Sequence, residues 1–229
     1  MKFLVVIYLM INILFAQSNE FIFSQLYIPY GWVQINNSRN QNDSPSIYTK
    51  EIFGADYQAL MIKDTISAES KKIINIINNV ESYDNIFTSS KLVSTSVISR
   101  KNNFVDAYQH LPVPIPFISD RHYIFRMNGF ENRPNVVRWI LLNRKDSEYS
   151  NYISQKEDSL SSVIYLDTGV GIWEVNKLEP NISEISYRLY MDTGGRLPKF
   201  LVEWLNKTAV NNVFADIKNA SLNLSLIHI

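Results

Sequence analysis

The stretch from Asp192 to Ala220 carries a long helical pattern of apolar and polar positions. Gly194 and Gly195 predict a flexible corner, and Pro198 suits the first turn of a helix, where its missing N–H is not needed. An apolar residue then recurs at every fourth position, which predicts a buried stripe: Leu201, Leu205, Ala209, Val213 and Ile217. The predicted solvent-exposed face carries Glu203, Asn206, Lys207, Asn211 and Asp216. Such a helix either caps a solid core or covers a cavity, and the pattern leaves both open.

Most of the chain before this helix alternates between apolar and polar residues, as half-buried β-strands do. Two early strands are predicted at 47–53 and 57–63, and a short helix follows between Ser67 and Val80. Seven more strands are predicted at 91–98, 104–110, 122–127, 136–143, 161–166, 171–178 and 184–192. No connection between them has the length and helical pattern of a parallel crossover, so we expect a large antiparallel sheet.

Several of these strands have one clearly apolar face, formed by Tyr123, Phe125, Met127, Val137, Trp139, Leu141, Trp173, Val175, Ile185, Tyr187, Leu189 and Met191. A curved sheet with this inner face, closed by one amphipathic helix, is a helix-grip arrangement of the α+β class. Such an arrangement tends to enclose space. The aromatic residues on the inner face then either fill the core or form the wall of a cavity.

The first residues predict a secretory signal peptide. Lys2 precedes an apolar run from Phe3 to Phe15, which is shorter than the roughly 20 residues of a membrane span. We place cleavage after Ala16, which gives a signal peptide at 1–16, an N-terminal extension at 17–28, a main domain at 29–220 and a poorly ordered tail at 221–229. This organisation predicts a secreted or periplasmic protein. The alternative is a membrane anchor made by the uncleaved segment.

Composition narrows the classes of function. The 229 residues include 22 basic and 22 acidic side chains, so no global field recruits nucleic acid. The chain has no cysteine, which excludes thiolate metal sites, cysteine nucleophiles and disulfides. Common catalytic and phosphate-binding motifs are also missing from the sequence. We therefore expect no catalytic residues, no metal and no cofactor.

Several motifs, in order, resemble those of the START domain, the lipid-transfer domain related to steroidogenic acute regulatory protein. Residues 114–126 read PIPFISDRHYIFR and resemble the proline-rich centre of that family. Residues 47–50 (IYTK), 66–68 (ISA), 171–173 (GIW) and 194–201 (GGRLPKFL) resemble further landmarks. The sequence departs from the family pattern at His122, where an acidic residue is usual, and at Thr193, where a proline is usual.

The resemblance implies a hydrophobic tunnel under the C-terminal helix that binds, and in some proteins transfers, one lipid or sterol-like molecule. We also expect a monomer, since the principal apolar faces are already used internally, with transient membrane contact and no nucleic-acid partner. It also favours a position for the Arg121 guanidinium in the cavity, where it would meet a polar head group. The predicted ligand-binding residues are Arg121, Tyr123, Phe125, Trp139, Trp173, Tyr187, Leu189, Leu201 and Leu205.

Two other classes of function stay open at this point. One is an enzyme with cyclase-like or hydrolase-like chemistry on a hydrophobic substrate, for which His110, Asp120 and Arg121 are the candidate polar centre. The other is an interaction module whose core is filled by side chains.

Overall fold

The computed structural model describes residues 18–35, 45–89, 93–130, 132–145, 148–160, 162–195 and 197–223. The predicted signal peptide and the last six residues of the predicted tail lie outside these ranges. None of the helices within the described ranges is both long and apolar enough to cross a membrane.

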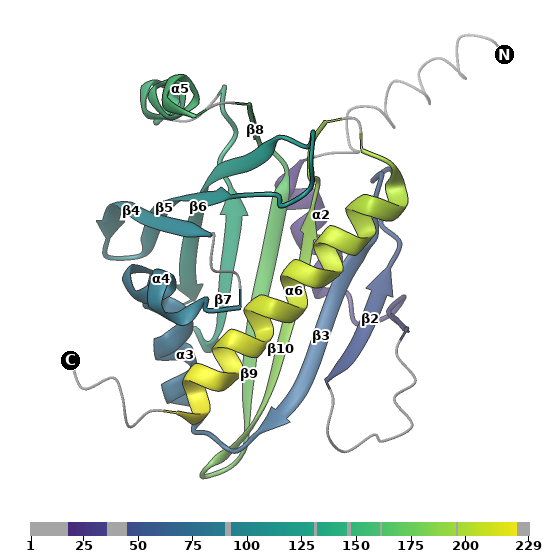
Figure 1. Cartoon of the computed structure of the whole chain (residues 1–229). Helices are drawn as coiled ribbons and strands as arrows, with labels where there is room; N and C mark the ends of the chain where they lie inside the picture. The colour runs from purple at the N-terminus through teal and green to yellow at the C-terminus, as the bar shows by residue number, and fades with distance from the viewer. Residues whose placement is uncertain are drawn as a thin grey trace, which may run out of the picture.

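A ten-stranded curved sheet forms the body of the protein (Figure 1). Its strands are β1 (Val33–Gln34), β2 (Ser46–Lys50), β3 (Ala59–Ile66), β4 (Ser94–Lys101), β5 (Phe104–Leu111), β6 (Asp120–Phe130), β7 (Arg133–Leu141), β8 (Val163–Tyr165), β9 (Gly169–Glu179) and β10 (Ile182–Met191). The strand order is β1-β2-β3-β10-β9-β7-β6-β5-β4, with β8 paired to β6. All nine predicted strands are present, with shifted ends.

One pairing differs from the predicted antiparallel sheet. β8 runs parallel to the first three residues of β6, where Asp120 pairs with Val163 and His122 with Tyr165. Antiparallel β7 covers only the other end of β6, from Phe125 onward. The connection between β6 and β8 includes β7 and a helix, so it is long enough for a parallel return.

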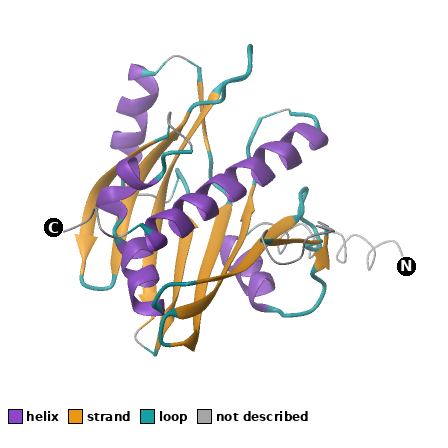
Figure 2. Ribbon diagram, turned by 60° about the horizontal axis from the view of Figure 1, so that its bottom comes forward, coloured by secondary structure: helices purple, strands orange, loops and turns teal. Residues whose placement is uncertain are grey.

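The long helix α6 (Lys199–Leu222) lies across the inner face of the sheet, together with α3 (Ser70–Asn78) and α4 (Tyr83–Ile86) (Figure 2). A short 3-10 turn, Val80–Ser82, joins α3 to α4. The main core lies between these helices and the sheet and includes Ile73, Ile77, Phe214 and Ile217. This arrangement confirms the predicted α+β helix-grip fold.

The buried face of α6 matches the predicted stripe only in part, since Ile217 is buried and Val213 packs against the core. Its most buried residues are Val202, Asn206, Val210, Phe214, Asp216, Ile217 and Ser221. At 3.6 residues per turn, a strict four-residue spacing rotates by about 40° at each step, so five such positions cannot stay on one side. Leu201 and Leu205 are therefore only half-buried, whereas Asn206 and Asp216, predicted to be wet, point inward. Pro198 is the N-cap residue and not part of the first turn, and α6 runs two residues past the predicted boundary at Ala220.

Two helices on the outer face were not predicted. α2 (Asn19–Tyr27) lies in the predicted N-terminal extension and packs Ile22, Phe23 and Leu26 against β9 and β10. The Asn19 carboxamide forms two hydrogen bonds with the sheet: its Nδ2 donates to Leu141 O at 2.9 Å, and its Oδ1 accepts from Gly169 N at 2.9 Å. α5 (Ser150–Ser159) has a polar sequence, and Ile153 is its one buried residue within the described ranges.

Candidate ligand-binding cavity

A cavity of about 120 Å³ lies between α6 and the inner face of the sheet. Strands β5, β6, β7, β9 and β10 form its floor, and α4 and α6 form its sides. Six predicted residues line it: Tyr123, Phe125, Trp139, Trp173, Tyr187 and Leu189. Their role as ligand-binding residues stays a prediction, but the alternating pattern of the strands correctly placed them on one wall.

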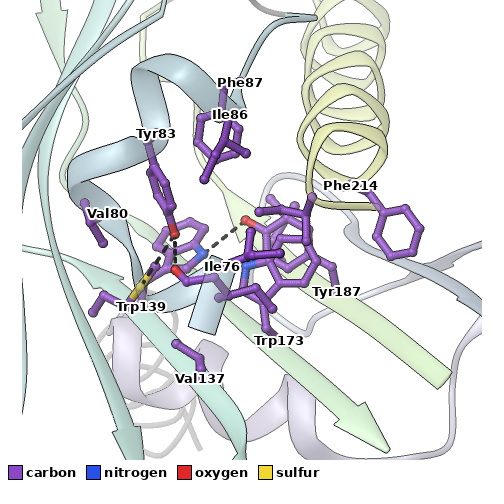
Figure 3. Close-up of a cluster of buried hydrophobic side chains, with 14 of the residues drawn as sticks. Ile76, Val80, Tyr83, Ile86, Phe87, Val137, Trp139, Trp173, Tyr187 and Phe214 are labelled. Carbon is purple, nitrogen blue, oxygen red and sulfur yellow. Dashed lines mark hydrogen bonds between the residues drawn. The ribbon is translucent and has the colours of Figure 1, made fainter. Parts of the chain in front are cut away.

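Stacked aromatic rings form one side of the cavity wall (Figure 3). Trp173 and Tyr187 are cross-strand partners on β9 and β10, and their ring centroids are 3.9 Å apart with an interplanar angle of 5°. Phe214 of α6 lies near-parallel to Trp173, with 6.1 Å between ring centroids. These contacts dock the helix onto the sheet through aromatic surface, which is the largest apolar area a side chain offers.

The Trp139 indole lies across β9, over Gly171. The two residues are register partners on β7 and β9, and a Cβ added at Gly171 would lie only 2.4 Å from Trp139 Nε1. The missing side chain at Gly171 therefore makes room for the ring. From there Trp139 Nε1 donates a hydrogen bond of 3.0 Å to the Tyr187 hydroxyl on β10.

The polar residues Gln109, Asn206 and Tyr83 in the cavity wall were not predicted. Tyr123 Oη donates to Gln109 Oε1, and Gln109 Nε2 donates to Thr95 Oγ1 at 2.9 Å. Asn206 of α6 donates from Nδ2 to Met191 O at 3.1 Å. Tyr83 Oη donates to Ile77 O at 2.5 Å. Gln109 and Asn206 interrupt apolar patterns, and a polar residue at an inward position was the signal that could have identified them.

The phenols of this wall stay neutral. Burial raises the pKa of Tyr83, Tyr123 and Tyr187 well above the ordinary value of a tyrosine. The hydroxyls also influence one another, since a charge on Tyr187 would raise the pKa of the other two. The cavity thus presents hydrogen-bonding groups without a fixed charge.

Three predicted residues lie outside the lining of this cavity: Arg121, Leu201 and Leu205. The buried Arg121 guanidinium donates to three backbone carbonyls, those of Ser119, Thr193 (2.9 Å) and Gly194 (3.2 Å). It therefore holds the loop before α6 against the start of β6. Contrary to the prediction, it does not reach the cavity. Leu201 and Leu205 miss the lining because the inner face of α6 begins at Val202 and Asn206.

The candidate polar centre for an enzyme does not form in the cavity. His110 Nε2 pairs with Asp120 Oδ2 at 3.2 Å, and neither residue lines the cavity; Arg121 binds the three backbone carbonyls described above. His122 is fully buried on the outer face, under α5, with its Nε2 3.5 Å from Glu157 Oε1. Burial is the main reason that its pKa is lowered, and Glu157 opposes that effect. Within the described ranges, no three histidine or carboxylate side chains are grouped to hold a metal ion.

Solved structures with the same arrangement are numerous. Human STARD10 superposes with a TM-score of 0.67 at 13% identity, over 90% of this chain and 79% of that one. A STAR-related lipid transfer protein from Xanthomonas axonopodis gives 0.61 at 14% identity, over 85% of this chain and 99% of that one. The chain has the START fold. The Zhui aromatase/cyclase from a Streptomyces species shares this fold more distantly, with a TM-score of 0.50 at 12% identity, over 71% of this chain and 92% of that one.

In sequence, no protein-family model and no curated protein matches the chain. The START likeness therefore rests on the three-dimensional arrangement and on the short motifs at 114–126 and 194–201.

Proposed function

We propose that this START-fold protein binds one hydrophobic small molecule, without covalent chemistry, in the cavity under α6. The observation that carries the proposal is the wall itself. Five strands and two helices contribute aromatic and aliphatic side chains to one space between α6 and the sheet, and among the described residues no carboxylate, lysine or arginine lines it. A pocket with an apolar wall and few polar groups is the usual form of a small-molecule site.

The fold comparison supports a lipid or another hydrophobic compound as the ligand. The Xanthomonas protein is described as a lipid transfer protein. In our proposal transfer is reversible, because moving a ligand from a bilayer into this cavity exchanges one apolar surrounding for another. We also keep the proposal that the protein works outside the cytosol, which is supported by the signal-like pattern of residues 1–16.

The size of the cavity limits what it holds in this conformation. Typical ligand pockets measure about 300–1,000 Å³, whereas this one measures about 120 Å³. A long acyl chain therefore requires the wall to move. Unbranched Met127 and Met191 line the cavity and can adopt other rotamers without branching clashes.

The enzyme alternative gains no support from this wall. The fold also occurs in an aromatase/cyclase, but His110, Asp120 and Arg121 do not line the cavity. We therefore propose binding rather than catalysis.

Native mass spectrometry of the purified full chain tests the proposal. We expect a fraction of the protein to carry a co-purified hydrophobic molecule, or to take one up from a mixed lipid extract. A protein that stays empty with both sources contradicts the proposal and favours an interaction module. Conversion of a bound compound into a product, lost in Arg121→Ala, would favour the enzyme.

A further inference from the structure

The Tyr187 hydroxyl is a polar group of the cavity wall whose hydrogen bonds are incomplete. It accepts from Trp139 Nε1 at 3.0 Å, and within the described part of the chain no hydrogen bond uses its own proton. Its neighbours are already paired, since the Tyr83 hydroxyl donates to Ile77 O and the Tyr123 hydroxyl to Gln109 Oε1. A buried donor without an acceptor is costly, which makes such a group a pointer to a missing partner.

The position of this hydroxyl is fixed by its surroundings. The Tyr187 ring lies flat on Trp173, at 3.9 Å between centroids, and the Trp139 indole holds the phenolic oxygen from the β7 side. Only the hydroxyl proton can rotate. Accepting the indole N–H also polarises the phenol and strengthens it as a donor. Tyr187 lines the cavity and is only 6% exposed, so its free proton is available to an occupant of the cavity and not to bulk water.

The size and the aromatic lining of the cavity indicate which kind of molecule fits beside the Tyr187 hydroxyl. A space of about 120 Å³ is close to the roughly 150 Å³ of an apolar protein cavity known to hold benzene. Rings of Tyr123, Phe125, Trp139 and Trp173 surround it, and aromatic rings pack well edge-to-face or offset against another ring.

We propose that the cavity binds a compact ring-bearing molecule with one hydrogen-bond acceptor, such as a ketone oxygen, and that the Tyr187 hydroxyl donates to that acceptor. This inference rests on the proposed function and makes it more specific. It names a ring with an uncharged oxygen as the ligand class, because such a molecule requires less movement of the wall than a flexible acyl chain does.

A pair of matched probes tests the inference. Acetophenone and α-methylstyrene have nearly the same shape, but only the first carries an acceptor oxygen. Binding of each to the full chain is measured through quenching of tryptophan fluorescence, since Trp139 and Trp173 line the cavity. In Tyr187→Phe we expect acetophenone to bind about five- to tenfold more weakly, the value of one hydrogen bond. The affinity for α-methylstyrene should stay within twofold.

Tyr190→Phe is the control variant. Tyr190 is buried on the same strand but belongs to the outer-face cluster, so its hydroxyl lies away from the cavity. We expect this variant to bind both probes as the wild type does. The infrared C=O stretch of acetophenone bound to the wild type gives a second reading that needs no variant. A hydrogen bond from Tyr187 moves it to lower wavenumber than in hexane.

The outcomes separate this inference from the proposed function. Three results would each overturn the inference: equal weakening of both probes in Tyr187→Phe, no weakening of acetophenone in that variant, or an unshifted C=O stretch. Unweakened acetophenone binding is the result expected if Tyr187 holds a water molecule instead. Failure of both probes to bind, when native mass spectrometry shows a bound lipid, overturns the ring class and leaves the proposed function standing. Failure of the probes and of every lipid contradicts both.

Discussion

Trp139 on β7 and Tyr187 on β10 are joined by a 3.0 Å hydrogen bond that passes over the intervening strand β9. The contact is possible because β9 has Gly171 at the crossing point. A ring from one strand can therefore rest on the backbone of the next and reach the third. This arrangement sets the shape of the cavity floor, and it gives the first prediction.

Gly171→Ala should destabilise the fold and disturb the cavity. The added methyl group would lie 2.4–2.7 Å from three atoms of the Trp139 indole, so the ring must move. Overpacking of this kind costs about 1–3 kcal/mol. Urea denaturation measures the loss. Gly129→Ala is the matched control, because a Cβ there meets nothing within 4 Å and should cost less than about 1 kcal/mol. Equal losses in the two variants would contradict the role given to Gly171.

Asp216→Ala should loosen the segment that follows α4. The buried Asp216 carboxylate accepts from Ser89 Oγ at 2.7 Å, from Ser89 N at 3.1 Å and from Thr88 Oγ1 at 3.3 Å. Loss of hydrogen bonds to a charged acceptor costs about 1.5–3 kcal/mol. We expect faster hydrogen exchange at the Ser89 amide and a lower free energy of unfolding.

Glu203→Ala is the control for that variant on the same helix. Its ion pair with Lys199 is 3.8 Å long and exposed, and such pairs contribute little. Unchanged exchange at Ser89 in Asp216→Ala would show that the carboxylate does not hold the segment.

Arg121→Lys should weaken the attachment of the loop before α6. A lysine keeps the positive charge but cannot direct fixed planar donors at the carbonyls of Ser119, Thr193 and Gly194. We expect a loss of about 1–3 kcal/mol in the free energy of unfolding. Acetophenone binding should change less than it does in Tyr187→Phe, since Arg121 does not line the cavity. A larger effect on the probe than on stability would place the guanidinium in the site after all.

The buried His122 should make the protein less stable in mild acid. Burial lowers its folded-state pKa below the ordinary value of about 6.5. Below pH ~6.5 the unfolded chain therefore takes up a proton that the folded chain resists, and stability falls as pH falls. The slope from this group is at most about 1.4 kcal/mol per pH unit.

His122→Gln should remove that part of the pH dependence. We expect the free energy of unfolding, measured by urea denaturation between pH 7 and pH 5, to fall less steeply in the variant than in the wild type. Glu157 acts in the opposite direction, since its carboxylate favours the charged histidine. Parallel curves for the two proteins would contradict a lowered folded-state pKa of His122.

The sequence predicted most of the fold because its strands alternate over long stretches. Inner-face residues such as Tyr123, Trp139 and Tyr187 could be identified from that alternation alone. The Trp139–Gly171 contact could not, because it depends on the register between two residues that are 32 positions apart in the sequence. α5 could not either, because Ile153 is too little apolar surface to produce a helical pattern. In α6 the polar Asn206 and Asp216 concealed the inner face, since buried polar residues with partners break the pattern that marks burial.

Occupancy of the cavity is tested most directly by blocking it from α6. Ala209 lies at the cavity but is exposed, so Ala209→Trp can fill the space without distorting the core. Lys207→Trp places the same side chain at an exposed position of the helix that does not line the cavity, and serves as the control. Native mass spectrometry of the wild type and both variants, after exposure to the same lipid extract, measures the bound fraction. We predict that Ala209→Trp loses the bound molecule while Lys207→Trp keeps it. Equal occupancy in all three proteins would contradict binding in this cavity.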